Sequence, residues 1–184
     1  MDTAKLKKFA QNARRSLIEQ VAAKLTKVLA EESLARRENP SAVKQLQKQI
    51  ADHGEEQVVE RVAYTWFNRF CALRFMDVNE YVTSSKIVSP SEGHTQPEIL
   101  SEALAGHIDE DMVSEKVQSR VFKLLSGEET SEDAQGDAYR LLLVAACNHW
   151  HAAMPFMFEK IADYTELLMP DDLLSSNSIL AYTR

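Results

Sequence analysis

The 184-residue chain has the composition of a globular domain, with 45% hydrophobic and 27% charged residues. This balance excludes an intrinsically disordered chain. The longest uninterrupted apolar runs, residues 141–147 and 152–158, are far shorter than the roughly 20 residues that a membrane helix needs. No apolar stretch with a cleavage site follows the first residues. We therefore expect a folded cytoplasmic protein without membrane contact, in which Cys71 and Cys147 stay reduced.

The net charge of −7 is distributed unevenly along the chain. Residues 1–50 contain 11 Lys and Arg against 5 Asp and Glu, whereas the remainder contains 10 against 23. Such a division can indicate a basic contact surface on an acidic body. A solvated amphipathic helix is the commoner explanation, because most charged side chains simply face water.

The first segment predicts a long amphipathic helix over residues 3–36, since apolar residues recur at helical spacing. Lys5, Lys8 and Arg15 lie opposite this stripe, and Arg14 lies at its edge. These four side chains are candidates for contact with DNA phosphates, although no recognised DNA-reading motif accompanies them. A break near Pro40 and a second helix ending at Gly54 would make residues 1–54 a basic helical hairpin, followed by a helical core domain over 55–184.

The next helical pattern begins at Glu55 and continues through residues 58–81. It predicts a buried central helix, because large apolar residues recur every three or four positions. Arg69 and Arg74 flank this apolar face, and Asp77 stands three residues after Arg74. An ion pair that orients the helix is the simpler interpretation. The alternative is that Arg69, Arg74 and Asp77 anchor a neighbouring domain.

The rest of the chain predicts further helices and little else. Residues 78–97 lack helical periodicity, and two short segments near 81–88 could pair as a small β-hairpin. Helices are predicted over about 98–105, 114–126, 138–154 and 156–168, with residues 128–137 as an exposed acidic linker. The predicted fold class is all-α. The apolar residues 179–182 stand close to the last residue, so we expect the sequence to be part of a longer protein.

No complete catalytic, cofactor or metal motif is present in the sequence. Cys147 and His151 share a helix face, but a closed zinc site needs four ligands and a packing role is the better interpretation. No acid is followed two residues later by a lysine, as a metal-dependent nuclease motif would require, and the five glycines are too dispersed for a phosphate loop. We therefore predict no catalytic, cofactor-binding or metal-binding residue in this chain.

Five segments, in order, resemble the PglX family, the adenine-specific DNA methyltransferases of type 1 BREX phage-exclusion systems. The segments are Leu6-Lys7-Lys8-Phe9-Ala10-Gln11-Asn12-Ala13-Arg14-Arg15, the central helix from Ala63 to Asp77, the stretch from Val88 to Leu100, and the stretches Tyr139 to His151 and Ile161 to Leu174. The resemblance covers the family's amino-terminal region. It implies a parent enzyme that uses S-adenosylmethionine to methylate adenine N6 in host DNA.

The family's catalytic and cofactor motifs lie beyond the matched region, so the resemblance supplies no site residue for this chain. Two hypotheses follow. In the first, the domain handles double-stranded DNA beside the methyltransferase core of the same protein, through Lys5, Lys8, Arg14 and Arg15. In the second, it is a protein-interaction module that docks the core or another BREX protein through its acidic remainder.

Overall fold

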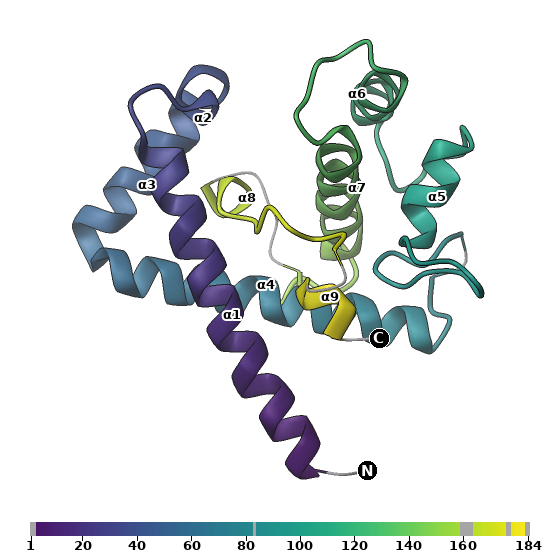
Figure 1. Cartoon of the computed structure of the whole chain (residues 1–184), viewed down its shortest axis with the longest axis horizontal. Helices are drawn as coiled ribbons and strands as arrows, with labels where there is room; N and C mark the ends of the chain where they lie inside the picture. The colour runs from purple at the N-terminus through teal and green to yellow at the C-terminus, as the bar shows by residue number, and fades with distance from the viewer. Residues whose placement is uncertain (1–2, 83, 159–163, 176–177, 183–184) are drawn as a thin grey trace. The chain divides into compact units, whose positions relative to one another are not determined.

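The computed structural model describes residues 3–82, 84–158, 164–175 and 178–182, and these confirm the all-α fold class (Figure 1). The helices are α1 (Thr3–Leu29), α2 (Leu34–Glu38), α3 (Pro40–His53), α4 (Glu55–Val78), α5 (Glu98–Leu104), α6 (Glu115–Ser126), α7 (Ala134–His151), α8 (Tyr164–Leu167) and α9 (Ile179–Tyr182). The only pairing of β type among these residues is an isolated bridge between Pro90 and Pro97. None of the helices in the described ranges is long and apolar enough to cross a membrane.

The chain forms two compact units that divide within α4. Unit 1 comprises Met1–Asn68 and Ile161–Asp171, and unit 2 comprises Arg69–Lys160 and Asp172–Arg184. The predicted division into residues 1–54 and 55–184 stays a prediction.

Unit 1 is held together by the first part of α4, whose apolar face is buried as the sequence predicts. Trp66 is fully buried, and its indole Nε1 donates a hydrogen bond to the Thr165 carbonyl over 3.1 Å. Arg61 donates to the Tyr164 hydroxyl over 2.8 Å and to the Gln49 amide oxygen over 2.7 Å. These bonds connect α4 to α3 and to the segment of α8. The core also contains Leu17, Val21, Leu25, Val43, Leu46, Val58, Val59 and Val62.

Unit 2 is built on α7, which packs against α5 and α6. Its fully buried side chains include Tyr139, whose hydroxyl donates to the Ile87 carbonyl over 3.1 Å. Tyr139 thereby fixes the irregular segment after α4. Residues from the second part of α4, from α5 and from α6 complete the core, namely Phe70, Leu73, Met76, Ile99, Leu100, Val121 and Leu124.

The predicted long first helix is shorter than expected. It ends at Leu29 rather than near residue 36, and a separate short helix follows. Ser33 causes the break: its hydroxyl donates to the Val28 carbonyl over 2.7 Å and accepts from the Arg36 amide, so it caps α2. Serine competes with helical hydrogen bonds in this way and favours caps over helix interiors.

The predicted hairpin near 81–88 is wrong for the described residues, which exclude Thr83. The amides of Ile87 and Val88 donate to the carboxylate of Asp77 instead of pairing with another strand. Two helix boundaries also differ. Helix α7 begins at Ala134, inside the predicted linker, because the Asp133 carboxylate caps it. Residues 156–158 are not helical, and residues 159–163 of that predicted helix lie outside the described ranges.

Candidate functional site

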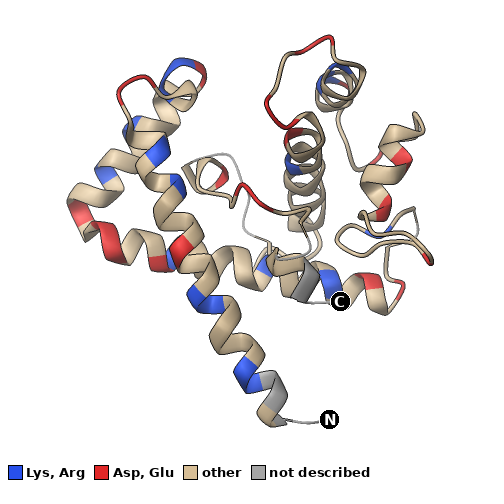
Figure 2. Ribbon diagram, viewed as in Figure 1, with Lys and Arg blue, Asp and Glu red and all other residues tan. Residues whose placement is uncertain are grey.

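The amino-terminal part of α1 is a basic surface of unit 1. Residues 3–18 contain five Lys and Arg and no Asp or Glu. Figure 2 shows blue segments along the described part of this helix. Lys8 and Arg15 are exposed. They are seven residues apart, which is about two helical turns, so they project from the same face of the helix. Lys7 is also exposed, whereas the side chain of Lys5 lies outside the described residues.

Packing fixes which way this basic face points. Ala13 and Leu17 are buried, and the ring of Phe9 lies 6.4 Å from that of Phe67. These residues occupy one side of α1. Lys8 and Arg15 therefore face the opposite side, where the described residues offer them no hydrogen-bond or ion-pair partner.

Three other basic residues of unit 1 form ion pairs with acids. Arg14 forms an exposed ion pair with Glu60 over 3.1 Å. Lys24 and Lys27 both pair with Asp171, the latter over 2.9 Å. Arg14, a predicted phosphate contact, thus has a competing intramolecular partner. An exposed pair of this kind contributes at most about 1 kcal/mol, so it can exchange for a phosphate.

Asp77, a predicted domain anchor, has a clear structural role. Its carboxylate accepts from the amides of Ile87 (2.8 Å), Val88 (2.8 Å) and Ser89 (2.9 Å), and from the Ser89 hydroxyl (2.8 Å). Arg74 in turn donates to the Ser89 hydroxyl oxygen. All three loop residues and Asp77 are buried. Arg74 and Asp77 therefore fasten the loop after α4 to that helix.

Arg69, the third predicted anchor, is 2% exposed, and its charge acts on Cys147 within unit 2. Burial raises the pKa of the Cys147 thiol to about 12, and the positive charge of Arg69 opposes this shift. A thiol in that state is not a nucleophile near neutral pH. Whether Arg69 also anchors a neighbouring domain stays a prediction.

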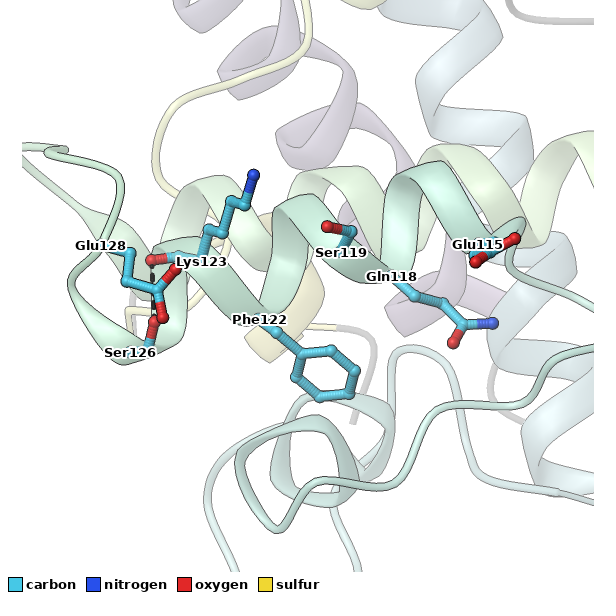
Figure 3. Close-up of a pocket in the computed structure, with 7 residues that line it drawn as sticks. All are labelled: Glu115, Gln118, Ser119, Phe122, Lys123, Ser126 and Glu128. Carbon is cyan, nitrogen blue, oxygen red and sulfur yellow. Dashed lines mark hydrogen bonds between the residues drawn. The ribbon is translucent and has the colours of Figure 1, made fainter.

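A pocket along α6 in unit 2 does not combine a nucleophile with a base among the residues that line it. This pocket has a volume of about 470 Å³ (Figure 3). Its lining places carboxylates at the two ends and an exposed phenylalanine between them, and consists of Glu115, Gln118, Ser119, Phe122, Lys123, Ser126 and Glu128. None of these groups forms a nucleophile and base pair.

Metal chemistry has no support among the described residues. No three His, Cys, Asp or Glu side chains come together there in a way that could hold an ion. Nδ1 of His151 lies 2.7 Å from the Phe158 carbonyl oxygen, to which it donates when that nitrogen carries the proton. Together with the burial of Cys147, this contact gives both residues packing roles.

Two known proteins are similar in sequence to this chain. It is 38% identical over 136 residues to the adenine-specific methyltransferase BrxX of Escherichia coli O9:H4 (strain HS), a match that covers 73% of this chain. It is 34% identical over 201 aligned positions to the adenine-specific methyltransferase PglX of Lacticaseibacillus casei (strain Zhang), which covers 91% of it. The chain is a homologue of part of these adenine-specific methyltransferases. No family model matches it.

The PglX-like resemblance predicted from the sequence is thereby confirmed. The chain spans only 11% of the BrxX relative and 16% of the PglX relative. The homology therefore supports a methyltransferase family for the parent protein. It assigns no activity to the 184 residues themselves.

The sequence interpretation missed two features of the site. It paired Asp77 with Arg74 but did not foresee the loop amides at residues 87–89, because backbone donors leave no mark in a sequence. It also did not predict that Phe75, an apolar residue of the same helix, is 59% exposed.

Proposed function

We propose that the chain is the amino-terminal helical region of a PglX-like DNA adenine-N6 methyltransferase of a BREX phage-defence system. In this role it assists DNA handling and supports the methyltransferase core, and it does not transfer methyl groups alone. S-adenosylmethionine would bind the core. Such enzymes hold the cofactor there beside a target adenine that has been extruded from the duplex. The partners are double-stranded DNA and the core. We expect the parent enzyme to act in the cytoplasm, because bacterial DNA lies there.

The basic face of α1 is the observation that carries the DNA-handling role. Lys8 and Arg15 are exposed, lie on one face and have no partner among the described residues. Duplex DNA carries one negative charge per roughly 1.7 Å of its axis, so a helix with basic side chains one above another can contact several phosphates. Such contacts position a protein on DNA without reading its sequence, which leaves recognition of the methylated site to other parts of the enzyme.

Charge reversal with a matched control tests this role. The variant Lys8→Glu/Arg15→Glu should weaken binding to labelled duplex DNA by at least about tenfold at about 0.1 M salt, because two phosphate contacts become repulsive. The control Lys44→Glu/Lys48→Glu changes the net charge equally, at two exposed positions of α3. Its affinity should stay within about threefold of the parent chain, since charges separated by more than about 10 Å are screened. Equal losses in both variants would refute the role of α1.

A docking module is the second candidate, and the charge of unit 2 favours it. That unit contains nine Lys and Arg against sixteen Asp and Glu. Such a surface repels phosphates and attracts basic protein surfaces. If the chain does not bind DNA while a full-length methyltransferase does, the docking of the core or of another BREX protein becomes the main function.

A further inference from the structure

An exposed apolar patch lies at the carboxyl end of α4, in unit 2. It consists of Phe75, Val78 and Tyr81, which are 59%, 62% and 58% exposed. The rings of Phe75 and Tyr81 meet edge to face, with centroids 5.9 Å apart and planes at 72°. We call these three side chains the α4 patch.

The end of the helix builds this patch. The Tyr81 amide donates to the Met76 carbonyl over 3.0 Å, and the Glu80 amide donates to the Asp77 carbonyl over 3.3 Å. Together they form a Schellman motif, in which the residue just before Tyr81 adopts a left-handed conformation. Glu80 takes that place with φ 55°, where glycine would be less strained. The turn brings Tyr81 back against Phe75, which is the apolar contact that usually accompanies the motif.

Helix capping explains why the two rings meet but not why they remain so exposed. A single exposed apolar side chain needs no explanation, whereas a cluster of large apolar groups marks an interaction surface. Aromatic residues are enriched among the side chains that anchor protein interfaces. The loop that borders the α4 patch is also rigidly held, because Asp77 binds its amides. The end of α4 that carries the patch is therefore tied to the loop at residues 87–89.

The surroundings of the α4 patch indicate what can cover it. Val78 and Glu80 border a pocket of about 430 Å³, whose rim includes the exposed Glu92. Its lining also contains two half-buried basic side chains, Lys86 and Arg74, of which Arg74 already donates to Ser89. The two exposed carboxylates, on an acidic unit, favour a partner surface with basic side chains around an apolar centre. They disfavour nucleic acid, whose phosphates they would repel.

We propose that the α4 patch is the docking surface for the remainder of a methyltransferase chain. This proposal rests on the proposed function, in which the 184 residues work as one part of such an enzyme. The two relatives have 84% or more of their own length outside the matched region, since the match covers 11% and 16% of them. A helical region of this size must contact that larger part to support it. The contact presents an apolar surface with basic side chains at its edge.

Thiol labelling in the full-length enzyme tests this docking surface. The substitutions Val78→Cys and Cys71→Ser are introduced together into two proteins. One is the 184-residue chain alone, and the other is a full-length methyltransferase that contains this chain. Maleimide should label the chain alone rapidly and the full-length enzyme at least about tenfold more slowly. The control Tyr64→Cys replaces another exposed side chain of α4, which is 64% exposed, and should react at similar rates in both proteins. Equal rates at position 78 in both proteins would overturn the proposal.

Two further arms separate the possible results. Slower labelling of the 184-residue chain as its own concentration rises would assign the patch to a second copy and overturn the proposal. Adding Tyr81→Glu to the full-length enzyme should restore fast labelling at position 78, while leaving the exposed α4 end folded. The variant Lys8→Glu/Arg15→Glu should leave labelling unchanged. A failure of DNA binding and a failure of docking are therefore measured independently.

Discussion

Replacing Asp77 by alanine should strongly destabilise unit 2. The carboxylate accepts three backbone amides and one hydroxyl from residues 87–89, all at 2.8–2.9 Å. Ile87, Val88 and Ser89 are at most 3% exposed. Water therefore cannot replace the lost acceptor without opening the loop.

The size of the effect follows from the amides left without an acceptor. A buried polar group that loses its partner costs about 1–3 kcal/mol. Since the loop relaxes in part, we expect the free energy of unfolding to fall by about 3–5 kcal/mol for three amides and a hydroxyl. Many domains have only about 5–15 kcal/mol in total, so unit 2 would become marginal.

Urea unfolding followed by far-ultraviolet circular dichroism measures this change. The control Asp111→Ala removes an exposed carboxylate from the same unit and should change the free energy of unfolding by less than about 0.5 kcal/mol. If Asp77→Ala costs no more than this control, the loop amides do not depend on Asp77 and our account of the anchor is wrong.

Three smaller predictions concern local features of unit 2. Glu80→Gly should raise the free energy of unfolding by about 0.5–1 kcal/mol in urea melts, because glycine tolerates φ 55°; a loss would contradict the strain argument. Cys147, with a pKa of about 12, should resist a thiol reagent at pH 8 while the half-buried Cys71 reacts slowly, and fast reaction of Cys147 would contradict its burial. The Ser84 hydrogen bond lowers the pKa of Asp109, so its stabilisation is present at pH 7 and fades as the pH falls through the lowered value. Asp109→Asn should therefore reduce stability at pH 7 and have a diminishing effect as the pH falls through the lowered pKa, as pH-dependent urea melts would show.

The sequence predicted helices wherever a long apolar period was present. Helix α4 begins at Glu55, as its acidic first turn predicts, and α3 ends at His53, just before the cap residue Gly54, whose φ of 86° suits glycine. Periodicity failed where a single polar side chain decides a boundary. Ser33 and Asp133 each cap a helix inside a segment whose composition predicted something else. Both are N-cap residue types, but a sequence does not show which of its many Ser and Asp residues are used as caps.

The candidate site could be predicted less completely than the fold. Exposure of Lys8 and Arg15 follows from their place opposite the apolar stripe of α1. The pairing of Arg14 with Glu60 joins residues 46 positions apart, and no local pattern contains that information. Likewise, the α4 patch depends on a helix cap at Glu80, a residue type that seldom adopts a left-handed conformation.

The central claim is that the basic face of α1 contacts DNA, and the salt dependence of binding tests it most directly. The 184-residue chain should bind labelled duplex DNA with an affinity that falls steeply between about 50 and 200 mM salt, with a logarithmic slope reduced by about 1 for each of Lys8 and Arg15 replaced by alanine. No binding at low salt, or binding whose slope ignores both replacements, would contradict the account.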